Sequence, residues 1–534
     1  MREILLGAIK EKIKQAGYVS MKLSGHSMYP TIKNEEEIII EEYKFEDVQI
    51  NDIIACYFNN SAHFIIHRVV GIEDIHGKRI LITKGDNNDY IDARAVKEGN
   101  FVGIVKIKEQ INDTYELAPS IFFLKNRNCV IKCDDTIRDF PSEILPPIIH
   151  RSVKKINRAL TTELIILPSY RCNLNCIYCS NDSNNNIHVA AKTESIVKAI
   201  TFVINNALIL RKLKASAFVK PARIIVSGGG EPTVEWNLLT FIVDTVKSFR
   251  DKYGNDIAEL LILTNAQIND DKADYLIHNF DDIAISCDGF STQNKQRPRM
   301  DGDSSKRYVA NFLDKLNKYN KEVSIRMTVT GEALPYLQDD VDYFFNSFKV
   351  VKDVIIEPFV KVGRGADYNI KKFNYDDFIS KFDAIARKYY NNVYNSVTLL
   401  EYANAYPCQR LSGISLVLSP YNVITCCDTV TPESELWESM IVGSLENNQI
   451  KILKEYVHSI PHECESCIAV NFCAGECPMH LNNLSDSEKD NLCKYKSEMV
   501  RMELLRRVEL SKKTKNIVFN GINYSVYTLP RGVI

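Results

Sequence analysis

The spacing of apolar positions predicts two different architectures in one chain. Between residues 18 and about 110, short apolar runs such as "EEIIIEEY", "DIIACYF" and "FIIHRVVGI" are separated by turns rich in Gly, Asn and Asp, which predicts a small β domain. Residues 1–17 place apolar side chains at helical spacing instead. They predict an amphipathic helix packed on that domain, and they lack the uninterrupted apolar run of a secretory signal.

From residue 160 the pattern changes to strands that alternate with helices. Helix-length stretches at 192–213, 235–252 and 304–319 follow short apolar runs, which we expect to be parallel strands. Six such runs within about 200 residues predict a partial (β/α)6 barrel. They are "TELIILPS", "ARIIVSG", "AELLILTN", "DIAISCDG", "EVSIRMTVT" and "KDVIIEP".

Breaks in these patterns divide the chain into five segments. Residues 112–158 contain "FPSEILPP" and look irregular, so we expect a linker there. Two alternating apolar runs around Asn520-Gly521 predict a C-terminal hairpin that adds to a neighbouring sheet. The predicted fold class is α/β multidomain: a β domain (1–111), the linker (112–158), the barrel (159–375), a cysteine-rich domain (376–500) and the tail (501–534).

The composition argues against certain classes of binding partner and favours one cellular compartment. The 534 residues are 45% hydrophobic and 25% charged with a net charge of −2, which gives no electrostatic basis for binding nucleic acid or an anionic membrane surface. No apolar run approaches the roughly 18 to 20 residues that span a bilayer, so we expect no membrane span. Fifteen cysteines without a secretory signal favour metal binding in a reducing cytoplasm over disulfides.

Three cysteines directly follow the first predicted barrel strand. "CNLNCIYC" contains Cys172, Cys176 and Cys179, at the end of a strand where the active sites of parallel barrels lie. Three thiolates on a short loop can hold three irons of a 4Fe–4S cluster and leave the fourth iron open to a ligand. Zinc is the alternative, and it fits less well because no fourth Cys or His lies close by in the sequence.

This C-x3-C-x2-C spacing, with an aromatic residue before the last cysteine, resembles that of the radical S-adenosylmethionine (SAM) superfamily. Two later strand ends strengthen the resemblance. "SGGGEP" resembles the glycine-rich motif that binds the methionine amino group of SAM, and "SCDG" resembles the polar strand end near the cofactor ribose. The resemblance covers about residues 160–370 and implies reductive cleavage of SAM to a 5′-deoxyadenosyl radical that takes a hydrogen atom from the substrate. The SAM-binding residues that it implies are Tyr178, Gly228, Gly229, Gly230, Glu231, Pro232, Ser286 and Asp288.

Two charged residues also belong to predicted barrel strands. Arg326 lies within "SIRMTVT" and Glu357 ends "VIIE", so we expect both to point toward the barrel mouth. Each can contact cofactor or substrate there, or equally form a structural ion pair.

A second group of cysteines follows the barrel. "CESCIAVNFCAGEC" and its flanking cysteines resemble the SPASM extension of radical enzymes that modify peptides and proteins, which carries two auxiliary 4Fe–4S clusters. Where the family has a glycine this chain has Asn422, the next-best residue for positive φ. The resemblance implies an outer cluster held by Cys464, Cys467, Cys473 and Cys493, and an inner cluster held by Cys408, Cys427 and Cys477. The inner cluster then has an open position for a substrate thiolate. Cys426 can replace Cys427 as a ligand, or join it and fill that position.

Asp428 follows Cys427 directly. In the anaerobic sulfatase-maturating enzymes, which this part of the chain resembles, an aspartate at the matching position is thought to act as a base. Asp428 is therefore a candidate to take a substrate proton, and a solvated or structural carboxylate is the alternative.

The β domain holds a candidate hydrolytic site. "GHSMYP" contains Ser27, "IIHRVVG" contains His67, and "TKGDNNDYID" contains Asp86 and Asp92. In this order the motifs resemble signal peptidase I of the archaeal and endoplasmic-reticulum type, over roughly residues 18–105. The resemblance implies that Ser27 is the nucleophile, His67 the base, and Asp86 and Asp92 the supporting acids. A domain that binds an extended peptide by strand addition without cutting it is the alternative.

Together these resemblances predict a cytoplasmic, oxygen-sensitive radical SAM/SPASM maturase. It would modify a ribosomally made peptide or protein, and the β domain would cleave or bind the leader. The expected cofactors are SAM and three 4Fe–4S clusters, two of them auxiliary; the expected partners are the precursor and a reductant such as flavodoxin or ferredoxin. The alternatives are a sulfatase-type formylglycine-generating maturase with a non-catalytic docking domain, a peptide-recognition protein, and a self-cleaving protease of the repressor type. That last group uses lysine as its base, which disfavours it here.

Overall fold

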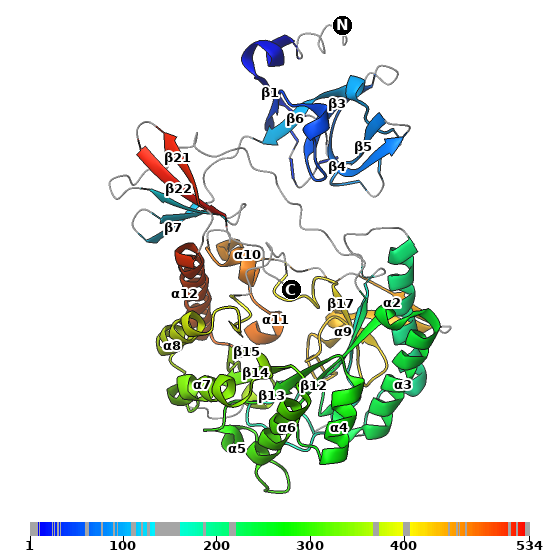
Figure 1. Cartoon of the computed structure of the whole chain (residues 1–534), viewed down its shortest axis with the longest axis vertical. Coiled ribbons are helices and arrows are strands. Elements are labelled where there is room, and N and C mark those ends of the chain that lie inside the picture. Colours follow the sequence, from blue (N-terminus) through cyan, green and yellow to red (C-terminus); the bar gives the residue numbers. More distant parts are fainter. Residues whose placement is uncertain are drawn as a thin grey trace. The chain divides into compact units, whose positions relative to one another are not determined.

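Figure 1 shows a computed structural model of the chain, whose internal contacts define two compact units. The first is Met1–Lys154 with Val508–Pro530, and the second is Lys155–Arg507 with Arg531–Ile534. The structure describes residue 9; residues 11–107 except 24, 26, 29–30, 33, 59–62, 76–77, 89–90 and 93; strands 114–118, 121–124 and 129–133; residue 158; residues 161–510 except 185–187, 213–220, 367–372, 399–405, 447–448, 455, 457, 459 and 465–466; and strands 514–519 and 522–528.

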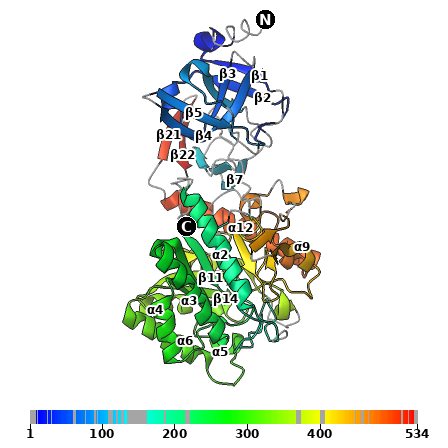
Figure 2. The same cartoon turned by 90° about the vertical axis from the view of Figure 1, so that its right-hand side faces the viewer.

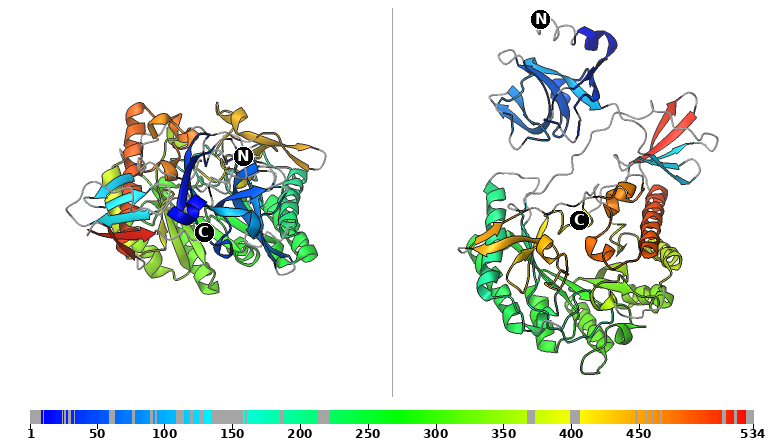
Figure 3. Two further views of the ribbon diagram at one scale, coloured as in Figure 1. Left: turned by 90° about the horizontal axis from the view of Figure 1, so that it is seen from above. Right: turned by 180° about the vertical axis from the view of Figure 1, so that it is seen from behind.

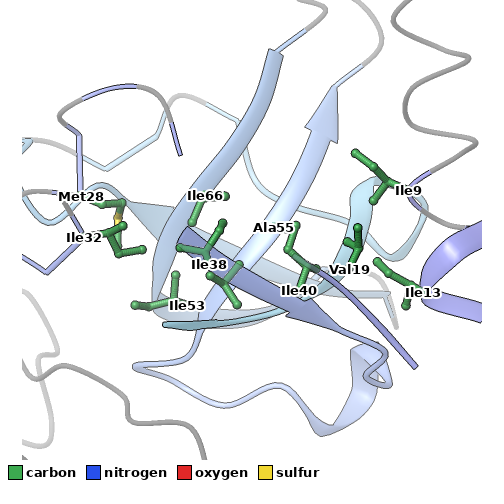
Figure 4. Close-up of a cluster of buried hydrophobic side chains, with 11 residues drawn as sticks. Ile9, Ile13, Val19, Met28, Ile32, Ile38, Ile40, Ile53, Ala55 and Ile66 are labelled. Carbon is green, nitrogen blue, oxygen red and sulfur yellow. The ribbon is translucent and has the colours of Figure 1, made fainter. Parts of the chain in front are cut away.

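The first unit contains a six-stranded antiparallel sheet in the order β1-β2-β6-β3-β4-β5. Its strands are β1 (Tyr18–Lys22), β2 (Glu37–Glu41), β3 (Ile53–Phe58), β4 (His63–Ile75), β5 (Lys78–Lys84) and β6 (Phe101–Ile107). Residues 11–16 are helical, and Ile9 and Ile13 pack in one core cluster with Ile40 and Ala55 (Figure 4). The predicted β domain is present, and the N-terminal amphipathic segment packs on it.

A five-stranded antiparallel sheet in the order β21-β22-β9-β8-β7 joins distant parts of the chain. Its strands are β7 (Thr114–Ala118), β8 (Ile121–Leu124), β9 (Cys129–Cys133), β21 (Thr514–Phe519) and β22 (Ile522–Thr528). The register of β22 on β9 runs from Tyr524↔Cys133 to Thr528↔Cys129, and Figure 3 shows the red hairpin beside the cyan strands. The hairpin prediction is confirmed. The linker prediction for 112–158 is wrong for β7 to β9, because the strands that complete their sheet come from the other end of the chain and leave no local signal.

The second unit is built on six parallel strands that pair in chain order. They are β10 (Glu163–Ile166), β11 (Ala222–Val226), β12 (Ala258–Thr264), β13 (Asp282–Ser286), β14 (Val323–Val329) and β15 (Val351–Pro358). Helices cover the outer face of these strands (Figure 2): α2 (Thr193–Lys212), α3 (Trp236–Tyr253), α4 (Asp270–Asn279), α5 (Gln293–Gln296), α6 (Ser305–Tyr319) and α7 (Leu337–Ser347). All six predicted strands and all three predicted helices are present, so the partial barrel is confirmed.

The barrel sheet continues into the cysteine-rich segment. β10 pairs in parallel with β17 (Ser415–Leu418), and antiparallel strands follow: β18 (Ile424–Thr425), β19 (Ile441–Glu446) and β20 (Gln449–Ile452). At the other edge β16 (Val393–Tyr394) pairs with β15. The remaining helices are α8 (Tyr375–Lys388), α9 (Trp437–Met440), α10 (Val470–Cys473), α11 (Pro478–Leu481) and α12 (Asp486–Leu510). One sheet therefore carries both the barrel and the strands that lead to the second group of cysteines.

Among the described helices, only α2 is long and apolar enough to cross a membrane by length and composition. Its buried positions, among them Ile196, Ile200, Val203 and Ala207, recur every three or four residues. It packs on β10, β11 and α3. A buried stripe of this kind is typical of a helix that covers a sheet.

Asn422 lies in the turn between β17 and β18 with a φ of 62°, as expected for a residue at a glycine position. Its side-chain oxygen also accepts a hydrogen bond from the N–H of Lys192, at 2.8 Å. Lys192 directly precedes α2, so the asparagine ties this turn to a barrel helix, which glycine does not do.

Candidate active sites

The loop that carries Cys172, Cys176 and Cys179 begins after β10, at the carboxyl end of the parallel strands. Two backbone N–H groups are directed at its sulfurs: Leu174 donates to Cys172 Sγ and Ser183 to Cys179 Sγ, each at 3.4 Å. Hydrogen bonds of this kind stabilise negative charge on sulfur and tune iron–sulfur clusters. These two N–H groups would stabilise the negative charge of the two sulfurs once a cluster is bound.

The glycine-rich segment after β11 runs directly against this loop. Gly230 donates its N–H to the carbonyl oxygen of Ser169 at 2.8 Å, and a Cβ on Gly230 would lie 1.9 Å from the carbonyl oxygen of Arg171. Gly228 and Gly229 have positive φ values of 63° and 67°. Only glycines allow this backbone path, so the close approach of two loops fixes the residue type.

Glu231 and Pro232 complete the glycine segment from within the protein. The Glu231 carboxylate is buried and accepts hydrogen bonds from the hydroxyl of Thr264 and the N–H of Asn265, both at 2.7 Å, and from Thr233. Burial raises the pKa of Glu231. Pro232 begins the short 3-10 helix η6 (Pro232–Val234). Both residues hold the glycine segment against β12, and direct contact with SAM remains a prediction for them.

Asp288 positions the aromatic residue of the cluster loop. The Tyr178 hydroxyl donates to Asp288, whose carboxylate also accepts from Arg297 and from the N–H of Thr328, each at 3.0 Å. The Asp288 side chain has 0% exposed surface. Its oxygens are therefore occupied within the protein, and Ser286, which is partly exposed at the end of β13, is the residue of "SCDG" with surface for a ligand.

A segment after β15, which the sequence patterns did not single out, is hydrogen-bonded to the cluster loop. The Arg364 guanidinium donates to the carbonyl oxygens of Cys176 (3.0 Å) and Ser183 (2.6 Å), and its backbone N–H donates to that of Cys179 (3.0 Å). A Cβ on Gly363 would lie 2.5 Å from the Cys179 oxygen. The available sequence signal was an arginine between two glycines just beyond a barrel strand.

These residues fit an iron–sulfur cluster. Burial raises the pKa of Cys172 and of Cys176 to about 12, so thiolates at these positions need the positive charge that iron supplies. Within the described residues no three Cys, His, Asp or Glu side chains converge on a single-ion position. A cubane cluster does not require such convergence, because each thiolate binds a different iron.

The cysteines beyond the barrel gather in two groups. The pKa of Cys477 is raised to about 12, mainly by burial and next by the charges of Cys427 and Cys408. These three thiols therefore lie near one another. In the second group, burial raises the pKa values of Cys464, Cys473 and Cys493, and the charge of a neighbouring thiol raises each of them further. That group consists of Cys464, Cys467, Cys473 and Cys493. These are the residues that the sequence resemblance assigns to the inner and outer clusters, and their role as ligands stays a prediction.

Cys426 has a different environment from Cys427. It is fully buried, and its thiol donates to the sulfur of Met440 at 3.6 Å. We therefore expect Cys426→Ala to retain full iron and sulfide after anaerobic reconstitution, whereas Cys427→Ala loses about four irons, one cluster. Iron and sulfide assays measure this difference. A loss of iron in Cys426→Ala as large as that in Cys427→Ala would identify Cys426 as a ligand.

Asp428 lies against both metal-binding loops. Its carboxylate pairs with Arg410 at 2.9 Å, and its backbone oxygen accepts a hydrogen bond from the Asn181 side chain at 2.8 Å. Asn181 is two residues beyond Cys179, so this bond joins the cluster loop to the segment of Cys427. Asp428 is thus tied to the cluster loop through its backbone, and its carboxylate is engaged by Arg410.

In the β domain, three side chains form a hydrogen-bonded row. His67 Nε2 lies 3.0 Å from Ser27 Oγ, and His67 Nδ1 lies 2.6 Å from Asp92 Oδ2. The Asp92 oxygen also accepts from the Thr83 hydroxyl at 2.7 Å. Because an ionised carboxylate only accepts, Nδ1 carries the imidazole hydrogen and Nε2 is free to accept the Ser27 proton. This is the geometry of an activated serine.

Asp86 has a different partner from the one predicted. Its two oxygens accept from Arg68 Nε (2.8 Å) and Nη2 (2.6 Å), and the Thr31 hydroxyl also donates to it at 2.5 Å. It therefore anchors the residue next to His67 rather than His67 itself. Nearby, a Cβ on Gly85 would lie 2.9 Å from His67 Nε2, so glycine keeps space at the imidazole.

Comparison with known proteins defines the class to which the central part belongs. Residues 166–343 match the model of the radical SAM superfamily, and the chain belongs to this superfamily. Its cofactors are SAM and a 4Fe–4S cluster.

Proteins similar to this chain include one sequence relative and two solved structures. A protein described as uncharacterized protein MJ0907, from Methanocaldococcus jannaschii, is 30% identical over 265 residues, which are 47% of this chain and 86% of that protein. The solved structure of native anSMEcpe with bound AdoMet has a TM-score of 0.50 at 20% identity and covers 65% of this chain and 98% of that one. Streptococcus suis SuiB bound to its precursor peptide SuiA has a TM-score of 0.40 at 16% identity, over 61% and 74% of the two chains.

Proposed function

We propose that the chain is a maturase of a ribosomally made peptide or protein, in which the radical SAM centre modifies the precursor and the β domain cleaves its leader. The observation that carries this proposal is the Ser27–His67–Asp92 row, present in the same chain as a cluster-binding barrel. When one site of the chain holds the precursor, the effective concentration of that precursor at the other site is raised.

In the barrel, the protein's part is to orient groups and to move protons. SAM and the cluster, when bound, supply the abstraction of a hydrogen atom from the substrate. Arg364 and the glycine segment hold the cysteine loop in place, and Asp428 accepts a proton from the substrate as it is oxidised. Two auxiliary clusters of the SPASM type on the two cysteine groups, a flavodoxin or ferredoxin as reductant, and a cytoplasmic location complete the proposal.

In the β domain, Ser27 attacks the carbonyl carbon of the scissile peptide bond while His67 Nε2 takes its proton. Asp92 keeps the imidazole in the correct tautomer and stabilises the imidazolium that forms. His67 then returns the proton to the leaving amine, and water releases the acyl group by the same route. Binding of the leader without cleavage is the competing role for this domain.

A sulfatase-type maturase that oxidises a Cys or Ser side chain is the second candidate. Asp428 favours it, because this carboxylate follows Cys427 and is tied by Asn181 to the cluster loop. The two candidates differ in the product, since the sulfatase-type reaction yields formylglycine and requires no cut.

Anaerobic turnover tests the proposal. The reconstituted chain is incubated with SAM, dithionite and a candidate precursor, and the peptide and 5′-deoxyadenosine are followed by mass spectrometry. We expect a peptide mass change of a few hydrogens together with 5′-deoxyadenosine, and a cut that disappears in Ser27→Ala while the mass change persists. A cut that survives in Ser27→Ala would rule out the peptidase role, and fully metallated protein that forms no 5′-deoxyadenosine would rule out the radical role.

A further inference from the structure

Arg326 lies on the inner face of the barrel. Residues on either side of it in β14, including Ile325 and Met327, are buried, whereas Arg326 is exposed. Successive side chains of a strand point to opposite faces, and the helices cover the outer face. The Arg326 position pairs with Ser286 on β13 and Ile355 on β15. The guanidinium therefore enters the barrel interior beside Ser286, the first residue of "SCDG".

Among the described residues the Arg326 side chain makes no hydrogen bond or ion pair, although two carboxylates flank it on β15. Asp353 and Glu357 lie two positions to either side of Ile355, so they share its face. Glu357 is engaged by the N–H of Ser396 at 2.6 Å, and Asp353 is hydrogen-bonded to Ser324. Glu357 is thus engaged by other residues, whereas Asp353 keeps one oxygen without a hydrogen-bond partner.

A guanidinium without a hydrogen bond or ion pair contributes little to the stability of the folded protein. Burial lowers the pKa of Arg326, although part of its side chain is exposed, and the charges of Asp353 and Glu357 raise it. A second positive group opposes it, because Arg410 is close enough to lower the same pKa. Arg410 pairs with Asp428 through one nitrogen, and its Nε has no partner. A partly exposed guanidinium without a salt bridge is available to an anion that arrives from outside.

We propose that Arg326, with Arg410 nearby, forms a carboxylate-binding subsite for the substrate peptide, which takes an acidic side chain or the C-terminal carboxylate beside the reacting position. Arginine presents two parallel N–H donors to a carboxylate, so the subsite fixes direction as well as charge. This inference rests on the proposed peptide maturase function and names a chemical requirement of its substrate.

SAM also has a carboxylate, on the same carbon as its amino group. The glycine segment after β11 is expected to hold that end of SAM. β14 lies three strands away from β11, which is about 14 Å along the sheet at the usual strand spacing. Ser286, the neighbour of Arg326, belongs instead to the motif expected at the ribose. Arg326 therefore faces the substrate side of the cofactor.

Arginine modification tests the subsite without a known substrate. Phenylglyoxal is added to the reconstituted, SAM-loaded full chain, and peptide mass spectrometry follows the adduct at Arg326. We expect millimolar acetyl-Gly-Glu-Gly-amide to slow modification of Arg326 by roughly threefold or more, and acetyl-Gly-Gln-Gly-amide to have no effect. Arg307, which pairs with Asp303 on α6, is the control and keeps its rate with either peptide. Equal protection by both peptides, or by neither, would overturn the subsite.

Calorimetry separates the two sources of a carboxylate. We expect Arg326→Gln and the unaltered chain to bind SAM with the same Kd, and to bind decarboxylated SAM with the same Kd. A weaker affinity of Arg326→Gln for SAM but not for decarboxylated SAM would assign the subsite to the cofactor and overturn the peptide assignment. Neither readout depends on turnover, so failure of the subsite is distinguishable from failure of the maturase function, which 5′-deoxyadenosine formation reports.

Discussion

Asp92→Asn is expected to lower the rate at which Ser27 reacts with a fluorophosphonate by on the order of 10⁴-fold. Asparagine in this position donates to or misorients the imidazole, so His67 Nε2 no longer accepts the Ser27 proton. The rate is measured on the full chain by mass spectrometry of the peptide that contains Ser27, and it needs no knowledge of the natural substrate.

Asp86→Asn provides the matched comparison, because it changes the other carboxylate of the same loop. It leaves the His67 hydrogen bonds in place and breaks a buried pair whose two side chains are 8% and 5% exposed. We expect the β domain to lose about 3 to 5 kcal/mol of stability and the folded fraction to label at nearly the normal rate. Equal labelling rates in Asp92→Asn and the unaltered chain would show that the row is structural.

Arg364→Lys is expected to remove hydrogen bonds that hold the cluster loop in place. A lysine cannot reach the Cys176 and Ser183 carbonyl oxygens together, and two hydrogen bonds from a charged donor contribute roughly 3 to 6 kcal/mol. We expect a loss of up to about four irons after reconstitution and a smaller SAM-dependent change in the electron paramagnetic resonance spectrum of the reduced protein.

Arg387→Lys is the control for this substitution. Arg387 pairs with Asp383 on α8, four residues apart on one helix, and its side chain is 43% exposed. It should leave the iron content and the spectrum unchanged. If Arg364→Lys behaves like Arg387→Lys, the contacts of Arg364 do not govern the cluster loop.

The barrel was predictable because its signals are local. Each strand is an apolar run followed by a helix at amphipathic spacing, and the cysteine loop and glycine segment follow strands whose ends meet at one edge. Ser27 and His67 were identified for a similar reason, since short motifs mark them. Asn422 was expected to have positive φ from its place in a motif, and it does.

The residue roles that the sequence did not predict share a physical cause. Each depends on contacts between residues that are distant in the sequence. The glycines on either side of Arg364 mark a turn, but they do not indicate that its guanidinium reaches a carbonyl oxygen 188 positions earlier. The distinction between Asp86 and Asp92 depends on which carboxylate the fold turns toward His67, and both lie in one loop. Asp288 looked like a ligand-facing residue because it ends a strand, but it is committed to Tyr178 and Arg297.

The sheet that joins β9 to the C-terminal hairpin also sets an order of events during synthesis. A ribosome adds roughly 5 to 20 residues per second, so β21 emerges roughly 20 to 80 s after β9. Every cysteine predicted to bind a cluster is made within that interval, between Cys133 and Thr514. The six-stranded sheet with Ser27, His67 and Asp92 is complete before this interval begins. The second edge of β9 stays unpaired until β22 of the C-terminal hairpin has been made. Closure of the five-stranded sheet thus marks the moment at which the whole radical unit has left the ribosome.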